Sequence, residues 1–340
     1  MLPIYATEKC AQSLFCKHET VLHWVSIRAE LQAGRGAMAS LNARGTPRST
    51  TRVSVSTLVL ALAVNGLVWG LIIALIALGL SIIFGLLDII NVAHGDFFML
   101  GTVFVLVLTL STGSYWLALA LVPLIGFAVG LLLERVIIRP TIRQASLTIV
   151  TTFGLSMMLQ EGVRATYGPQ PRRMAPPIEG TIPLFGIDYD VYRIFAAAFA
   201  ALCLVAFFVF LTRTKLGTWI RAVRHDPETA TALGVPVVRI CAITFGLGTA
   251  MALLGGAIAA PITTVEFRTG VDILPFCFMA VIIGGLGNLQ GTVAAAVLLA
   301  VLEGLVTSVT DPTIARIVSL GLMSVALLVR PHGLFSGATR

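Results

Sequence analysis

Long apolar runs alternate with short polar stretches along most of this chain. Several of the runs approach the roughly 20 residues that an α-helix needs to cross a bilayer. Strands of a membrane barrel would alternate apolar and polar residues, whereas these runs are continuous. The pattern therefore predicts an all-α, polytopic helical membrane protein with about 8 to 10 transmembrane or re-entrant helices. The apolar runs cover residues 57–90, 97–110, 116–133, 147–159, 194–211, 240–260, 273–283, 292–309 and 314–329.

Composition points to the same class. The chain has 340 residues, of which 57% are hydrophobic and only 11% are charged. Soluble domains carry about 25% charged residues, so these values indicate one integral membrane domain. The net charge of +7 is typical of basic cytoplasmic loops beside anionic lipid, and it does not by itself indicate nucleic-acid binding.

One charged stretch, residues 212–239, organises the pattern because apolar runs lie on both sides of it. It must sit in water between two membrane helices, and its basic character places it on the cytoplasmic side. Counting alternate spans from Trp116 onward places residues 134–146, 284–291 and the C-terminus on the same cytoplasmic side, and the near-neutral residues 161–193 outside. The stretch carries seven charges: Arg213, Lys215, Arg221, Arg224, Asp226, Glu228 and Arg239.

The same stretch is predicted to contain a short helix. Asp226 can cap a helix that begins with Pro227, since a side-chain oxygen satisfies free N–H groups and proline is tolerated in the first turn. Gly234 followed by Pro236 is a typical helix end. Such a helix could receive force from a soluble partner, whereas the alternative is a plain basic connecting loop. The residues that continue the helix are Ala230, Ala232 and Leu233.

The first apolar run is longer than a membrane is thick. It has 31 uncharged residues before Asp88, and a straight helix of that length would span about 50 Å. We expect the run either to tilt strongly or to break, at Gly79 or Gly85. One crossing before Asn91 would put the basic N-terminus outside, and two crossings would put it inside.

Polar residues between the first two apolar runs form a candidate functional segment. Asn91, His94 and Asp96 stand there together with Gly95. One interpretation is a hydrogen-bonded turn in which Asp96 caps the next helix and Gly95 permits a tight bend. The other is a conformational joint or a part of the permeation path, because polar groups inside a membrane are costly and tend to mark function.

Glu303 is a second candidate, about three turns along the apolar run that follows residues 284–291. A carboxylate at that depth needs a protein or water neighbour. It either makes a structural hydrogen bond or attracts an ammonium group in a transport path. The glycines of residues 284–291 indicate a tight bend between two helices, and they do not fit the GxxxxGK[ST] pattern of a phosphate-binding loop.

Residues 1–56 differ in composition from the rest, and we interpret them as an N-terminal extension, disordered over residues 39–56. The first 37 residues are expected to be dispensable, with Met38 as an alternative start. Residues 57–335 form the predicted transmembrane domain. No zinc-site spacing is present, so no metal site is predicted. Four residues of the extension were considered as ligands: Cys10, Cys16, His18 and His23.

Five sequence blocks, in order, resemble the LivH-type permeases that import branched-chain amino acids by ATP-binding-cassette transport. The resemblance spans residues 64–335. Two departures stand out: Asp96 replaces the usual Glu, and Gln290 replaces the usual Pro. The blocks are N-x-A-H-G at 91–95, E-R-x-x-x-R-P at 134–140, G-x-x-x-R-A at 217–222, G-G-L-G at 284–287 and R-P-H-G-L-F at 330–335.

The resemblance implies a multi-pass permease of the bacterial inner membrane with no catalytic residue and no cofactor of its own. A second, LivM-like permease subunit would pair with it, two cytoplasmic ATPase subunits would bind ATP, and a periplasmic binding protein would deliver the amino acid. The ATPase would contact the 217–234 loop. The residues assigned to this contact are Gly217, Arg221, Ala222, Asp226, Ala230, Leu233 and Gly234.

Alternatives remain open at this point. Related permeases carry urea, short amides or other amino acids. An ion-coupled secondary transporter would need buried ionisable relays, for which only Glu303, Asp88 and Asp272 qualify. An intramembrane enzyme would need a paired acid and base, and His94 is the only histidine between the spans outside the 212–239 stretch.

Overall fold

The computed structural model describes residues 55–141, 144–184, 187–307, 310–329 and 333. The predictions for the extension, including its candidate metal ligands and Met38, therefore lie outside the described residues. The first described helix begins at Val55, two residues before the expected start of the transmembrane domain at residue 57.

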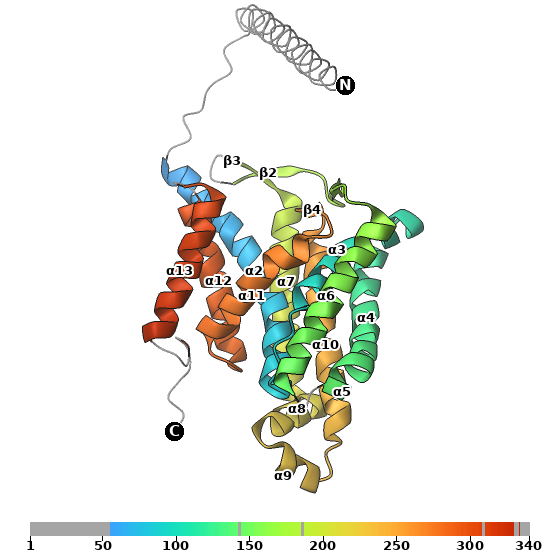
Figure 1. Ribbon diagram of the computed structural model, residues 1–340. Coiled ribbons are helices and arrows are strands. Elements are labelled where there is room, and N and C mark those ends of the chain that lie inside the picture. The colour runs from blue at the N-terminus through green and yellow to red at the C-terminus, as the bar shows by residue number, and fades with distance from the viewer. Residues whose placement is uncertain (1–54, 142–143, 185–186, 308–309, 330–332, 334–340) are drawn as a thin grey trace, which may run out of the picture. The chain divides into compact units, whose positions relative to one another are not determined.

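The described chain is a helical bundle, as the apolar pattern predicts (Figure 1). Within the described residues, six helices are long and apolar enough to cross a membrane, and Thr269–Gly284 is a shorter apolar helix. A π-helical turn, η1 (Glu134–Ile138), follows α4. The principal helices are α2 (Val55–Leu87), α3 (His94–Thr112), α4 (Tyr115–Leu133), α6 (Ala145–Tyr167), α7 (Val191–Arg213), α10 (Val237–Ala259), α11 (Thr269–Gly284), α12 (Leu289–Val306) and α13 (Pro312–Val329), with short helices α5 (Arg139–Thr141), α8 (Lys215–His225) and α9 (Pro227–Ala232).

Helix α2 is unbroken, so a break at Gly79 or Gly85 does not occur. Its glycines allow other helices to approach closely. A Cβ atom on Gly79 would lie 2.6 Å from the carbonyl oxygen of Gly248 on α10, and one on Gly66 would lie 2.8 Å from that of Ala300 on α12. Small residues at such crossings are typical of membrane bundles, where close packing drives helix association.

The two ends of the bundle carry different elements. Helices α5, α8 and α9 lie together at the lower end in Figure 1, and Gly287 of the α11–α12 bend lies against Arg224 of α8. Residues 134–146, 212–239 and 284–291, predicted on one side, therefore share one end. Helix α2 begins at the opposite end, where Leu62 lies against Gly304. The structure thus favours a single crossing before Asn91.

The opposite end carries short strands that the hydrophobic pattern did not predict. β1 (Arg172–Arg173) pairs with β4 (Thr264–Val265), and β2 (Thr181–Leu184) pairs with β3 (Ile187–Asp190), both antiparallel. Helix α6 also continues to Tyr167, beyond the expected end of its apolar run. The 161–193 region is therefore a helix end and a hairpin and not one long polar loop.

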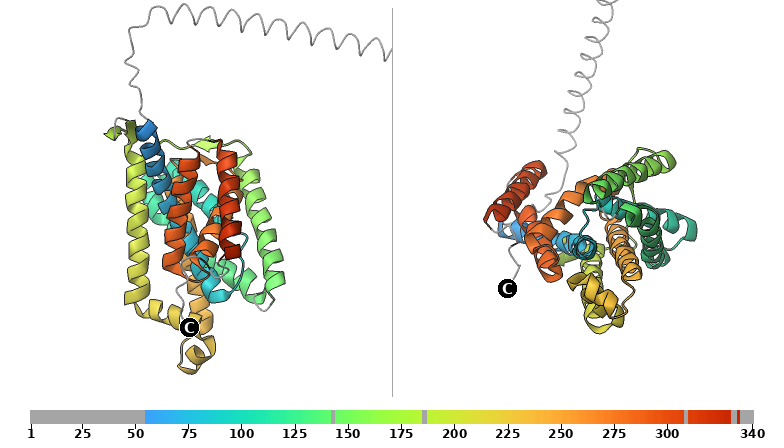
Figure 2. Two further views of the ribbon diagram at one scale, coloured as in Figure 1. Left: turned by 90° about the vertical axis from the view of Figure 1, so that its left-hand side faces the viewer. Right: turned by 60° about the horizontal axis from the view of Figure 1, so that its bottom comes forward.

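The core lies where α10 packs against α2, α3 and α4. Its largest buried side chains include Phe97, Phe98 and Phe245. A Cβ atom on Gly101 of α3 would lie 2.1 Å from the carbonyl oxygen of Leu253 on α10, so these two helices are in backbone contact. Figure 1 and the right-hand view of Figure 2 place α13 at the margin opposite α4.

Candidate functional site

After α2 ends, the chain runs back into the bundle. Residues 91–96, all buried except the half-buried Val92, are called the buried segment from here on. Asp88 has a positive φ of 52°, and the chain reverses at this residue. His94 Nε2 then donates to the carbonyl oxygen of Ile76 at 3.0 Å. Ile76 lies about three helical turns before the end of α2. Helix α3 therefore begins inside the bundle, well away from the end that carries α8 and α9.

Two side chains of the buried segment keep polar atoms without partners. Asn91 and His94 are both fully buried. Asn91 Oδ1 accepts from the backbone N–H of Ala93 at 3.1 Å, but Asn91 Nδ2 and His94 Nδ1 have no hydrogen-bond partner among the described residues. An unpaired buried polar atom costs about 1–3 kcal/mol. Such atoms in a native core call for an explanation, which is a bound water or ion, or a functional role.

Asp96 does not cap the following helix, contrary to the first interpretation. Helix α3 begins at His94, and no side chain caps it. Asp96 lies within the first turn, is 2% exposed, and accepts a hydrogen bond from Gln160 Nε2 at 3.0 Å. Gln160 of α6 also donates to Ser156 Oγ. Asp96 therefore ties α3 to α6, a link that the sequence did not reveal because the partners are far apart in the chain.

Gly95 permits a close helix contact and not a tight bend. A Cβ atom on Gly95 would lie 2.2 Å from the carbonyl oxygen of Gly270, and one on Gly270 would lie 2.7 Å from Asp96 Oδ1. The first turns of α3 and α11 therefore meet inside the bundle. Any larger residue at either glycine would force these two helices apart.

Glu303 lies apart from the buried segment. It lines a cavity of about 370 Å³ between α2, α3, α11, α12 and α13, here called the α11–α12 cavity, which does not include Asn91, His94, Gly95 or Asp96. The cavity also takes in Asp272 of α11 and Arg316 of α13. Phe98 of α3 lines it as well, so α3 is common to the cavity and the buried segment. The candidate path residues thus form two neighbouring groups and not one cluster.

The predicted short helix is confirmed. Asp226 Oδ1 accepts from the backbone N–H groups of Glu228 and Thr229 at 3.0 and 3.1 Å, and α9 starts at Pro227. Gly234 has a φ of 84°. The Thr229 hydroxyl and backbone N–H, as the main causes, hold the pKa of the exposed Asp226 carboxyl below its usual value.

A longer helix, α8, precedes α9 and was missed from the sequence. Thr214 caps it by accepting from the N–H of Gly217 at 3.0 Å. Its buried residues are Gly217, Ile220 and Val223, three apart and therefore on one face of a helix. This spacing was the available signal. Together α8, α9 and the link to α10 form what we call the α8–α9 segment, residues 214–236.

The residues assigned to the ATPase contact fall into two groups. Gly217 and Ala230 are buried, and a Cβ atom on Gly217 would lie 2.3 Å from the carbonyl oxygen of Leu211. These two residues hold the segment against the bundle. Arg221 is exposed, and Leu233 is 79% exposed, so both are available to a partner. Ala222 lies at intermediate depth.

Arg224 connects the α8–α9 segment to the bundle, a role that the sequence did not suggest. Its guanidinium lies against Gly85 near the end of α2 and against Gly287 in the α11–α12 bend, where a Cβ atom would come within 2.4 Å of Nη2. Partial burial between these backbones lowers the pKa of Arg224. A movement of α8 would therefore reach α2 and the α11–α12 bend directly.

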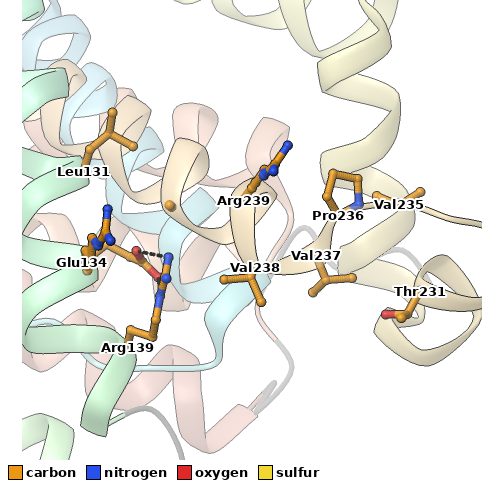
Figure 3. A pocket seen from close by; sticks show the side chains of 11 residues that line it. Leu131, Glu134, Arg139, Thr231, Val235, Pro236, Val237, Val238 and Arg239 are labelled. Atoms are coloured by element: carbon orange, nitrogen blue, oxygen red, sulfur yellow. Dashed lines mark hydrogen bonds and ion pairs between the residues drawn. The ribbon is translucent and has the colours of Figure 1, made fainter.

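A groove of about 700 Å³ separates η1 from the short link that joins α9 to α10. In Figure 3, Glu134 and Arg139 lie on one side, and Thr231, Val235 and Pro236 lie on the other. Glu134 is 3% exposed and pairs with Arg139 at 3.0 Å. The groove therefore lies between η1 and the α8–α9 segment. The described part of the chain contains no group of three His, Cys, Asp or Glu side chains placed to hold a metal ion.

The bundle, its buried polar segment and the structured loop at one end define a multi-pass membrane transport subunit. The chain belongs to the family of branched-chain amino acid transport system permease components, whose family model matches residues 62–327. This confirms the resemblance drawn from the five sequence blocks.

Individual relatives agree with this assignment. The chain is 28% identical over 292 residues to the high-affinity branched-chain amino acid transport system permease protein LivH of Salmonella typhimurium, covering 79% of this chain and 93% of the relative. It is 28% identical over 295 residues to BraD of Pseudomonas aeruginosa, covering 80% and 94%. LivM of Salmonella typhimurium is 28% identical over 288 residues, covering 76% and 67%. No solved structure matches the chain.

Proposed function

We propose that this chain is the permease subunit of a binding-protein-dependent importer for branched-chain amino acids in the bacterial inner membrane. The observation that carries the proposal is the α8–α9 segment. It is folded, capped by Thr214 and Asp226, and joined directly to α7 and α10. A bundle with no phosphate-binding motif needs an external source of energy, and this segment offers a rigid surface through which it could arrive.

The proposed assembly contains four kinds of subunit. A LivM-like permease pairs with this chain, two ATPase subunits dock at the end that carries α8 and α9, and a periplasmic binding protein delivers substrate at the opposite end. Separate relatives are named LivH and LivM permease proteins of a branched-chain amino acid transport system, which supports a pair of different permeases. ATP is bound by the partner subunits.

The proposed coupling runs from the ATPase to the buried segment. Arg221, Ala222, Leu233 and Gly234 contact the ATPase, while Gly217, Asp226 and Ala230 keep the segment folded. Arg224 passes its movement to α2 and the α11–α12 bend. The first turns of α3 and α11 then shift at the contact of Gly95 with Gly270, which changes the side to which the path opens.

Within this mechanism Asn91, His94, Gly95 and Asp96 form the gate. The unpaired atoms of Asn91 and His94 would gain partners in a second conformation, so the two conformations could be close in energy. Glu303 lies in the path on the delivery side of the gate, in the α11–α12 cavity.

The test uses the whole transporter reconstituted in liposomes with its binding protein and ATP. A double variant, Arg221→Ala with Gly234→Ala, should remain in the membrane, continue to hydrolyse ATP, and lose about ten-fold or more of its L-leucine uptake. Gly234 has a positive φ, so alanine distorts the end of α9. Unchanged uptake would contradict the proposed coupling.

A matched control stands at the other end of the bundle. Arg173→Ala with Gly168→Ala also removes an exposed arginine and a glycine of positive φ, and it should leave coupling intact. Urea and short amides serve as competing substrates in the same assay. If they are taken up and L-leucine, L-valine and L-isoleucine are not, the substrate assignment is wrong while the permease assignment stands.

A further inference from the structure

The α11–α12 cavity combines an apolar wall with opposite charges. At about 370 Å³ it falls at the small end of ligand pockets, which span about 300–1,000 Å³. Trp69, Ile73, Phe98 and Phe276 line it from three helices, and the charged residues of the lining are Asp272, Glu303 and Arg316. A small amphipathic solute with two charged groups would match this lining, whereas an inorganic ion or a lipid tail would match only half of it.

The cavity lies near the delivery end of the bundle. Asp272 is in the first turn of α11, and Glu303 is within a turn of the end of α12. Asn65, another lining residue, accepts a hydrogen bond from Arg193, which is in the first turn of α7. These ends lie opposite the α8–α9 segment, so the cavity is on the side at which substrate is proposed to arrive.

The charges in the cavity are incompletely paired. Arg316 Nη1 and Asp272 Oδ1 are 3.7 Å apart, longer than the 3.2 Å or so of a hydrogen bond. The Arg316 guanidinium lies over the ring of Phe276 at 5.3 Å. The Glu303 carboxylate forms no hydrogen bond or close ion pair with any described residue, and Arg316 is the charged group that attracts it. The side chains of Arg316 and Asp272 are 49% and 60% exposed, so their remaining hydrogen-bonding positions are open to water or to a ligand.

A neutral polar group also lacks a partner there. Thr263 lines the cavity, and its buried hydroxyl makes no hydrogen bond within the described part of the chain. The open acceptor on Glu303, the open donors on Arg316 and this hydroxyl are the groups that an amino acid's ammonium and carboxylate would satisfy.

We propose that the α11–α12 cavity binds a free α-amino acid with an apolar side chain as it enters the permease. Glu303 receives the ammonium group, and Arg316 receives the carboxylate, held over Phe276 and beside Asp272. Trp69, Ile73 and Phe98 surround the side chain. This inference rests on the proposed transport function and adds to it a selection step within the permease itself.

The direct test measures binding to the whole permease and ATPase complex in nanodiscs without the binding protein. Radiolabelled L-leucine is the probe, and L-leucinamide and 4-methylpentanoate compete with it. The first competitor lacks the carboxylate and the second lacks the ammonium group. The wild-type complex should prefer L-leucine to each by at least about ten-fold, which corresponds to about 1.4 kcal/mol. Equal binding of all three, or no binding of L-leucine, would overturn the proposal without any variant.

Two variants separate recognition from structure. Glu303→Gln should remove the preference over 4-methylpentanoate and retain that over L-leucinamide. Arg316→Gln should do the reverse, because each variant removes one charge partner. If Glu303 and Arg316 had a purely structural role, each variant would weaken the binding of all three ligands together. That result would overturn the proposal. Glu161→Gln and Arg268→Gln, outside the cavity lining, serve as matched controls and should bind like the wild type.

A parallel uptake measurement keeps the two proposals distinct. If the wild-type transporter with its binding protein imports L-leucine but the binding panel shows no charge selectivity, the cavity proposal alone fails. If the wild-type transporter imports no branched-chain amino acid, the proposed function fails, and the cavity proposal fails with it.

Discussion

The α8–α9 segment and the buried segment satisfy their polar groups in opposite ways. Asp226 bonds with residues two and three positions further along the chain. In the buried segment, His94 bonds with Ile76, 18 positions away, and Asp96 bonds with Gln160, 64 positions away. The first region can fold and move as a unit. The second exists only when several helices are in place, so its energy depends on how those helices are arranged.

In the proposed mechanism, this difference suits the two regions to different parts. A segment held together by local bonds can transmit a push without losing its own structure. A segment held by distant partners, with Asn91 Nδ2 and His94 Nδ1 unpaired, responds when those partners shift. A single substitution in the buried segment should therefore impair transport more than a single substitution in the α8–α9 segment.

The largest effect is expected at the contact of α3 with α11. Gly95→Val would place side-chain atoms where the carbonyl oxygen of Gly270 lies, and overpacking costs about 1–3 kcal/mol or more. Uptake of L-leucine should be abolished, and the melting temperature of the purified complex should fall. Gly154→Val on α6 is the control, because a Cβ there meets nothing within 4 Å. Normal uptake by Gly95→Val would refute the close contact.

Removing a gate side chain should impair transport more than assembly. In Asn91→Ala or His94→Ala an unpaired atom is lost together with one hydrogen bond, whose net value is about 1 kcal/mol. We expect about a ten-fold loss of uptake with a nearly normal yield of assembled complex on size-exclusion chromatography. Parallel loss of both quantities would instead indicate a purely structural role.

A smaller effect is expected where Arg224 meets the α11–α12 bend. Gly287→Ala adds a Cβ that conflicts with the Arg224 guanidinium at 2.4 Å, so the ratio of substrate imported to ATP hydrolysed should fall by a few-fold. Gly113→Ala carries the same positive-φ strain, with nothing within 4 Å of the added atom. If both variants lower the ratio equally, backbone strain and not the Arg224 contact is responsible.

The smallest effect is expected at the cap of α9. Asp226→Ala removes both cap hydrogen bonds and should lower coupling by about two-fold, whereas Asp226→Ser retains a cap and should restore it. Because the folded pKa of Asp226 is lowered, its stabilisation is present above the unfolded value of about 3.9 and is lost only as the pH falls through the lower folded value. Asp226 stays ionised between about pH 6 and 8, so its titration should not change coupling in this range. If coupling does change with pH there, and the change disappears in Asp226→Ser, the lowered pKa of Asp226 is contradicted.

The same contrast explains what the sequence could reveal. Apolar runs predicted the helical bundle because burial in lipid imposes long continuous segments. The cap at Asp226 was predictable since all its partners are neighbours in the chain. The interpretation of Gly95 as a bend and Asp96 as a cap was wrong, because their contacts with Gly270 and Gln160 depend on the packing of distant helices. Their place in the transport path stays a prediction. Helix α2 was expected to break at Gly79 or Gly85, but it is unbroken. These glycines instead lie against Gly248 and Gly287, which the sequence alone does not show.

The sequence also did not predict the hairpin of β2 and β3 or the position of Arg224. Short strands carry too few residues for a pattern of period two to stand out. Arg224 looked like one of several basic residues in the 212–239 stretch. Both Arg224 and Arg221 are exposed, and only the proximity of Gly85 and Gly287 distinguishes Arg224.

The central claim is that the α8–α9 segment lies at the cytoplasmic end, where ATPase subunits act on it. The most direct measurement is labelling of Leu233→Cys with a membrane-impermeant thiol reagent, in a background without the five native cysteines. Ile182→Cys in the opposite hairpin serves as the reference. We predict that Leu233→Cys is labelled in inside-out vesicles only, and less so when the ATPases are bound, while Ile182→Cys is labelled in right-side-out spheroplasts only. Labelling of Leu233→Cys in those spheroplasts would contradict the account.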